Sequence, residues 1–329
     1  MPVDPILVPF LPTPPMPDDI DFPAYRAEAE SMEQGLAEQL IEPGPEGAER
    51  RVVTIPVTDG AIELAIYRPA LSHELPVHIY LHGGGWVGGS ALSVWNDTLA
   101  RERAVRADCV VIAVNYRKAP EHKFPTPLLD CQAALEWAVE HATEIGVDPR
   151  IITIGGGSAG ANLAAALVLK LRDDHGPSIA LQLLEVPALD LTLSLPSHSD
   201  PDLGSRYALH RQDFEQLIPA YLGDHGDPRN PYVSPLLAPN LSGLPPAYIM
   251  SSEFDVLRDD GATYAQKLLQ AGVPAVFSLQ LGHTHPSSAF TKIMPAARRW
   301  RDEVIGVLQA ANSGDAPFLV RGAASDITA

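Results

Sequence analysis

The chain has 329 residues, of which 46% are hydrophobic and 19% are charged, and its 41 acidic and 23 basic residues give a formal net charge of -18. This composition is typical of a globular enzyme, and no stretch approaches the roughly 18 consecutive apolar residues that a membrane span needs. The negative charge argues against nucleic acid or an anionic membrane surface as a partner.

The first 45 residues are expected to lie outside the main fold. "MPVDPILVPFLPTPPMPDD" lacks the positive charges and the long apolar run of a secretory signal, which predicts a cytoplasmic protein. Its prolines are expected to prevent a helix, so this arm is predicted to be extended or disordered. Residues 18–41 space their apolar side chains by three to four and predict a surface helix.

From residue 51 onward, short apolar runs alternate with helix-forming segments. "RVVTIPV" and "IELAIYRP" flank the turn signal "TDG" and predict an antiparallel hairpin at a sheet edge. Apolar strands separated by helices indicate an α/β fold, with a mostly parallel sheet of about eight strands and helices on both faces. The further strands are predicted at 77–81, 109–116, 151–156, 180–187, 246–252 and 275–281, and the helices at 93–107, 127–143, 158–173, 258–272 and 287–310.

Residues 190–245 interrupt this alternation with polar turns and one short helical piece. An insertion of this length between two strands is usually functional, and we expect a lid over the carboxyl edge of the sheet. The predicted organisation is an N-terminal arm and cap helix at 1–45, a first part of the core at 46–189, the cap at 190–245, and a second part of the core with a C-terminal tail at 246–329.

The turn in "ITIGGGSAGANLAAAL" matches two different motifs. Starting at Gly155 it fits G-x-G-x-x-G, the dinucleotide fingerprint, while Gly156, Ser158 and Gly160 fit G-x-S-x-G, which presents a nucleophilic serine. A dinucleotide site needs the turn in the first βαβ unit and an acid after the next strand. Glu185 ends that strand, but the turn comes late in the sheet, so we favour the serine motif.

The segment "LHGGGWVGGS" follows the strand at 77–81 and offers candidate oxyanion donors. His82, Gly83, Gly84 and Gly85 form the H-G-G-G element that accompanies the serine turn in lipases and esterases. Glycines there let backbone N–H groups approach a substrate closely. A flexible glycine loop is the less favoured alternative for this segment taken alone, and Trp86 beside it is either a pocket wall or core packing.

A carboxylate is expected after the strand at 246–252, to orient a catalytic base. We favour Asp255, because Glu253 and Asp259 fit solvated or helix-terminal groups, and Asp259 or Asp260 suits the first turn of the next helix.

The base itself is expected after the last strand, in "GHTHP". His285 is favoured, because Pro286 suits the first position of a closing helix that would aim His285 back over the sheet. His283 is the alternative, and otherwise a polar loop residue. The order Ser158, Asp255, His285 is the order found in α/β hydrolases.

These motifs together resemble the hormone-sensitive-lipase-like family of α/β-hydrolase esterases, the bacterial family IV carboxylesterases. The resemblance covers about residues 50–310 through "HGGGWVGGS", "VNYRKAPEHKFPTPLLDC", "GGSAGANLAAAL" and "SPLLAPNLSGLPPAYIMSSEFDVLRDDG". Two departures stand out: Gly157 where the family usually has an acid, and Pro286 and Ser287 where it has glycine and phenylalanine after the histidine. Both lie beside the reacting groups, so they affect the shape of the pocket.

The resemblance implies a serine carboxylesterase that hydrolyses small, short-acyl esters through an acyl-serine intermediate. The same residues suit a lactone or amide hydrolase, and some members of this fold are non-catalytic small-molecule receptors. No metal and no cofactor are implied; the partner is an ester substrate, and the edge strand at 275–281 suits a homodimer. The implied site consists of a triad of Ser158, Asp255 and His285, oxyanion donors at Gly84, Gly85 and Ala159, and substrate contacts at His82, Gly83 and Trp86.

Cys109 and Cys131 are too few for a disulfide framework. We expect both to be buried, with structural roles.

Overall fold

The computed structural model describes residues 2–11, 14–203, 207–285 and 287–314. Predictions that fall on Pro286, or on a tail beyond residue 314, lie outside the described residues. In chain order the elements are η1 Pro5–Phe10, α1 Phe22–Leu40, β1 Ala48–Val57, β2 Gly60–Pro69, β3 Leu75–Leu81, α2 Val94–Arg106, β4 Val110–Asn115, α3 Thr126–Glu140, α4 Ala142–Ile145, β5 Val147–Gly157, α5 Ala159–Asp173, β6 Leu181–Glu185, α6 Pro196–Ser199, α8 Arg211–Leu222, η2 Pro235–Leu237, β7 Ala247–Phe254, α9 Arg258–Gln270, β8 Ala275–Thr284, η3 Ser287–Ala289 and α10 Pro295–Ser313.

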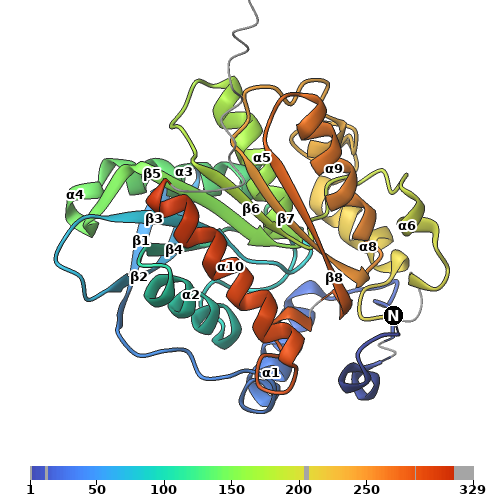
Figure 1. Cartoon of the computed structure of the whole chain (residues 1–329). Helices are drawn as coiled ribbons and strands as arrows, with labels where there is room; N and C mark the ends of the chain where they lie inside the picture. The colour runs from blue at the N-terminus through green and yellow to red at the C-terminus, as the bar shows by residue number, and fades with distance from the viewer. Residues whose placement is uncertain (1, 12–13, 204–206, 286, 315–329) are drawn as a thin grey trace, which may run out of the picture.

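A single eight-stranded sheet forms the centre of the molecule, in the order β1-β2-β4-β3-β5-β6-β7-β8 (Figure 1). Strand β2 runs antiparallel to both β1 and β4, and every other neighbouring pair is parallel. The predicted edge hairpin is confirmed, with Thr58 and Asp59 as its two-residue turn. The mostly parallel sheet of about eight strands is confirmed as well.

Helices cover both faces of the sheet, as predicted for strands that are apolar throughout (Figure 1). Strand β3 shows how its residues divide between the faces. Val77, Ile79 and Leu81 pack in the core that α3, α5 and α9 share, while Tyr80 packs in the core beneath α2 and α10. Because both sets are buried, the carboxyl ends of the parallel strands are held rigidly in one row, and the candidate site lies along that row.

The closing helix begins later than predicted. We expected it at residues 287–310, but α10 spans Pro295–Ser313 and is preceded by the short 3-10 turn η3. Ser287 accounts for the delay: its hydroxyl accepts a hydrogen bond from the Thr284 amide (3.1 Å) and donates to the Thr284 carbonyl (2.9 Å), which closes a local turn. Pro295 then occupies the first turn, where a missing N–H costs little.

The N-terminal arm is also more ordered than predicted. Residues 5–10 form a 3-10 helix despite their prolines, because Asp4 caps the Ile6 amide at 3.0 Å and a proline occupies the first turn. Leu7, in the middle of this turn, is 1% exposed and packs against Phe290 and Met294. The arm is therefore attached to the segment that follows the candidate histidines.

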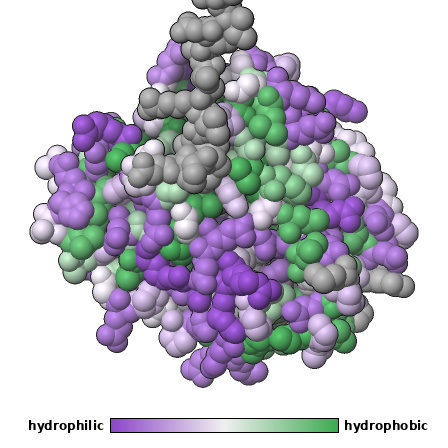
Figure 2. All heavy atoms as spheres, viewed as in Figure 1, coloured by the Kyte–Doolittle hydropathy of each residue, from purple (hydrophilic) through white to green (hydrophobic). Residues whose placement is uncertain are grey.

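The predicted cap insertion contains more helix than the single piece expected, namely α6, α8 and η2. Strand β8 lies at the sheet edge as expected, and its Leu279 and Leu281 are exposed. Figure 2 shows hydrophobic side chains in the region of β7 and β8 among hydrophilic ones. Pairing of two subunits through β8 stays a prediction.

In the described part of the chain, no helix has both the length and the apolar character to cross a lipid bilayer. Cys109 and Cys131 are buried free thiols, as expected.

Candidate active site

Ser158 occupies a sharp turn between β5 and α5. Its backbone has φ 55° and ψ -120°, a conformation that a side chain tolerates only when the surroundings enforce it. Glycines on either side make this possible, because a Cβ at Gly156 or at Gly160 would collide with the Leu81 carbonyl oxygen on β3. The turn is also tied down by the Ser158 amide, which donates to the Glu185 carbonyl at 2.8 Å.

The three residues of the predicted triad lie together in one hydrogen-bonded chain. The Ser158 hydroxyl is 2.9 Å from Nε2 of His285, and Nδ1 of His285 is 2.7 Å from Oδ2 of Asp255. Asp255 is 2% exposed, and its other oxygen accepts the Leu257 amide at 2.9 Å. An imidazole that bonds to a carboxylate through Nδ1 has Nε2 free to accept a proton from a hydroxyl.

The glycine loop after β3 lies against this serine. A Cβ on Gly83 would come within 3.5 Å of the Ser158 Cβ, and Gly84 and Gly85 have φ of 125° and 60°. Within the described residues, the amides of Gly84 and Gly85 donate to no protein acceptor. Ala159 is the first residue of α5, where amides have no partner inside the helix. All three predicted donor positions line the same cavity as Ser158.

His82 holds the glycine loop in place through a hydrogen bond to its backbone. It is fully buried, its ring stacks on Tyr116 with centroids 4.3 Å apart, and Nδ1 donates to the Gly83 carbonyl at 2.7 Å. Burial, with a smaller contribution from Lys118, lowers the pKa of His82 to about 3, so the ring is neutral. Unlike Gly83 and Trp86, it is not among the residues that line the cavity described below.

Asn162 is a buried residue that the sequence interpretation missed. Its amide donates to the carbonyls of Ala188 (2.8 Å) and Val233 (2.9 Å) and accepts the indole N–H of Trp86 at 3.2 Å. Trp86 also stacks on Tyr221 at 4.8 Å, so it is both core packing and cavity wall. A lone polar side chain inside the apolar run "AGANLAAAL" was the signal that could have revealed this bracing role.

The alternative residues are placed elsewhere. His283 is 1% exposed, and its Nδ1 lies 2.9 Å from the Ser287 hydroxyl. Glu253 accepts the Gly282 amide at 2.8 Å, and Asp259 accepts the Ser197 amide at 2.9 Å. Asp260 lies in the first turn of α9, as expected, and it is fully buried and bonds to His198 at 2.6 Å.

We predict that the folded protein loses stability in acid because His283 is buried. Burial lowers its pKa to about 4, whereas an unfolded histidine titrates near 6.5, so the unfolded chain takes up a proton that the folded chain refuses. Between about pH 7 and about pH 4.5, we expect this group alone to cost roughly 2–3 kcal/mol of the free energy of unfolding. Urea unfolding at both pH values, compared between the wild type and His283→Gln, measures it. An equal acid loss in the two proteins would contradict the expectation.

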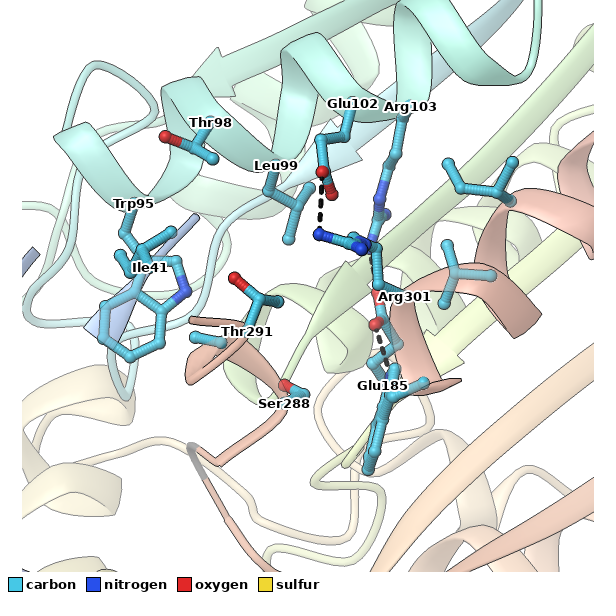
Figure 3. Close-up of a pocket in the computed structure, with 14 residues that line it drawn as sticks. Ile41, Trp95, Thr98, Leu99, Glu102, Arg103, Glu185, Ser288, Thr291 and Arg301 are labelled. Carbon is cyan, nitrogen blue, oxygen red and sulfur yellow. Dashed lines mark hydrogen bonds and ion pairs between the residues drawn. The ribbon is translucent and has the colours of Figure 1, made fainter. Parts of the chain in front are cut away.

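Glu185 is occupied by structural contacts, which removes the dinucleotide interpretation. One oxygen pairs with buried Arg103, and the other accepts the Trp300 indole at 2.8 Å (Figure 3). A ribose would need that carboxylate free. These residues border a small apolar cavity of about 60 Å³ beside the candidate site. Among the described residues, no group of three or more His, Cys, Asp or Glu is arranged to hold a metal ion.

The buried pair between Arg103 and Glu185 is expected to matter for folding. Arg103→Met would leave the Glu185 carboxylate buried without a cation, which typically costs about 3–5 kcal/mol. The measurement is the denaturant midpoint, and the matched control is the double variant Arg103→Met/Glu185→Leu, which should recover most of the loss. If the single and double variants are equally unstable, packing rather than charge explains the effect.

A cavity of about 790 Å³ opens in front of Ser158 and His285. Three parts of the chain that are distant in sequence line it: residues 14–33, the loop at 83–89 and residues 208–217. Gly157, where the resembled family carries an acid, also lines it, and a Cβ there would meet nothing within 4 Å. The missing side chain therefore leaves the cavity wider next to the serine.

Comparison with known proteins agrees with this geometry. A family model described as the alpha/beta hydrolase fold matches residues 78–288. The carboxylesterase NlhH of Mycobacterium tuberculosis is 36% identical over 304 residues, which are 90% of this chain and 92% of the relative. An arylesterase of Saccharolobus solfataricus is 34% identical and covers 87% of this chain and 92% of its own. The structure of an esterase from Pyrobaculum calidifontis superposes with a TM-score of 0.87 at 33% identity, over 94% of this chain and 99% of that one.

Proposed function

We propose that this chain, which belongs to the α/β-hydrolase family and is an ester-hydrolysing enzyme, is a serine carboxylesterase. The proposed reaction passes through an acyl-serine intermediate on Ser158. The observation that carries this proposal is the chain of contacts from Ser158 through His285 to buried Asp255. The relatives named carboxylesterase and arylesterase support the reaction class.

In the proposed reaction His285 takes the hydroxyl proton of Ser158 while Oγ attacks the ester carbonyl. The bond between serine and the acyl carbon forms, and the negative charge collects on the former carbonyl oxygen. The amides of Gly84, Gly85 and Ala159, which line the same cavity as Ser158, are proposed to stabilise that oxyanion, and losing one such donor typically raises the barrier by about 3–4 kcal/mol. His285 then returns the proton to the departing alcohol, and water repeats both steps on the acyl-serine.

Asp255 holds the imidazole in the tautomer this reaction needs and stabilises its positive charge. The chemistry requires no metal or organic cofactor. His82, Trp86 and Asn162 are positioning residues: they fix the glycine loop and the cavity wall through contacts given above. Gly83 and Trp86 also border the substrate.

The arm and helix of residues 1–45 and the insertion at 190–245 are proposed to act together as the cap. Both line the cavity, and the Met16 amide donates to Asp213 on α8 at 2.8 Å, which joins them. A cap assembled from two segments would limit the size of the acyl group. This supports small, short-acyl esters as substrates.

A panel of p-nitrophenyl esters of rising acyl length tests the function, with a γ-lactone and an anilide alongside. The proposal expects kcat/KM to peak at short acyl groups and to be far lower for the lactone and the amide. Turnover of the lactone or the anilide above every ester would reassign the reaction. No turnover of any substrate, together with reversible binding, would favour a receptor.

A further inference from the structure

The charged side chains that line the cavity in front of Ser158 are all acidic. They are Glu28, Glu33, Glu185 and Asp213, and no lysine or arginine of the described chain lines the same cavity. Glu185 is neutralised by Arg103, but Glu28, Glu33 and Asp213 have no ion pair within the described residues. A cavity that carries one sign of charge between low-dielectric walls imposes its field on whatever enters.

Asp213 is the best placed of these acids. It is 6% exposed on α8 and is fixed by two backbone amides, those of Met16 and His210, each at 2.8 Å. Leu217, one helical turn further along, reaches the oxyanion loop, because a Cβ on Gly85 would lie 2.8 Å from its Cδ2. Residues one turn apart lie on the same face of a helix, so Asp213 and Leu217 line the cavity from the same side of α8.

The charge of Asp213 also acts on Tyr25 of α1. Tyr25 lines the same cavity, and its pKa is raised first by burial and then by the negative charge of Asp213. The aromatic rings of Tyr25 and Phe214 line this cavity as well. Aromatic faces attract cations and offer nothing to an anion, so the wall chemistry and the acids favour the same sign of charge.

We propose that this cavity selects esters by charge, with Asp213 as a specificity-determining residue: it favours esters that carry a positive charge over neutral ones of the same shape, and rejects esters that carry a negative charge. The proposal rests on the esterase function proposed above and names its substrate class. For two unit charges on the order of 10 Å apart in a partly desolvated cavity, the Coulomb interaction changes the ratio of cationic to anionic turnover by about tenfold.

Three acetate esters test it: acetylcholine, its neutral carbon analogue 3,3-dimethylbutyl acetate, and 4-acetoxybutanoate. All three give the same acetyl-enzyme, so kcat/KM reports only binding and acylation. Their different intrinsic reactivities cancel when each ratio is compared between a variant and the wild type. We expect Asp213→Asn to lower the cation-to-anion ratio of kcat/KM by about tenfold at about 0.01 M ionic strength, and by less at about 1 M, where the Debye length falls to about 3 Å.

Glu215→Gln is the matched control, because Glu215 is an exposed acid on the same helix that does not line the cavity. It should leave the ratio unchanged. Glu28→Gln, at the exposed side of the cavity, should lower the ratio in the same direction by about twofold, and it carries the test alone if Asp213→Asn fails to fold.

Equal ratios in the wild type, Asp213→Asn and Glu28→Gln would overturn the charge selection. In that case 3,3-dimethylbutyl acetate would still be hydrolysed, and the esterase function would stand. If the wild type hydrolyses none of the three esters, the esterase proposal fails with it.

Discussion

Ser158→Ala is expected to lower kcat on p-nitrophenyl acetate by about 10⁵–10⁶, because among the described residues no other hydroxyl bonds to Nε2 of His285. The Ser158 hydroxyl lies 2.9 Å from Nε2 of His285. With the alanine methyl group in its place, only the oxyanion donors and substrate binding remain to accelerate attack by water. Initial rates at saturating ester give kcat for both proteins. Thermal unfolding checks that the variant is folded. Retention of a tenth of the wild-type rate would exclude Ser158 as the nucleophile.

His285→Gln supplies the matched comparison for this prediction. Groups that act in one proton-transfer chain are strongly non-additive, so the double variant Ser158→Ala/His285→Gln should be no slower than either single variant. His283→Gln should keep most of the activity, because His283 bonds to Ser287 rather than to the serine of the turn. A large loss in His283→Gln with little loss in His285→Gln would reverse the assignment of the base.

Asp255→Asn is expected to lower kcat by about 10⁴ while leaving the fold intact. An asparagine amide can present its N–H₂ to Nδ1 of His285, which holds the ring in the wrong tautomer and leaves the imidazolium unsupported. The Leu257 amide keeps its acceptor, since the asparagine oxygen can replace Oδ1. In Asp255→Asn we therefore expect kcat to fall steeply while the unfolding temperature changes little.

Glu253→Gln is the control for Asp255→Asn. Glu253 lies two residues earlier on β7, and a glutamine oxygen can still accept the Gly282 amide that Glu253 binds. We expect its rate to stay within about twofold of the wild type. A comparable loss in both variants would show that the end of β7 tolerates no change, and would withdraw the particular role given to Asp255.

The order of strands and helices along the chain was predictable because the sequence signal for each element is local. The hairpin follows from "TDG" between alternating strands, and the turn at Ser158 follows from glycines at the two positions where a Cβ would strike β3. The order of the parallel strands then brings Asp255 and His285 to the edge where Ser158 stands. Motifs at strand ends are therefore placed together by the sheet, although they are far apart in the chain.

Two kinds of feature were mispredicted. The start of α10 is delayed by a local side-chain turn around Ser287, whereas η1 is held by a long-range contact, because Leu7 is buried in one cluster with Phe290 and Met294. The partner of Glu185, at the end of β6, is Arg103, which is 82 residues earlier on helix α2. Local propensity does not report such pairs. For the same reason the acidic lining of the cavity, assembled from α1, β6 and α8, was absent from the sequence interpretation.

Mass spectrometry after reaction with a fluorophosphonate tests the acyl-serine proposal most directly. The reagent loses fluoride and forms a stable bond to a serine where a neighbouring base removes the hydroxyl proton and oxyanion donors face the phosphoryl oxygen. The prediction is one adduct per chain, on the peptide that contains Ser158, with none in Ser158→Ala and strongly slowed labelling in His285→Gln. An adduct on a different residue, or labelling of Ser158→Ala at the wild-type rate, would contradict the proposal.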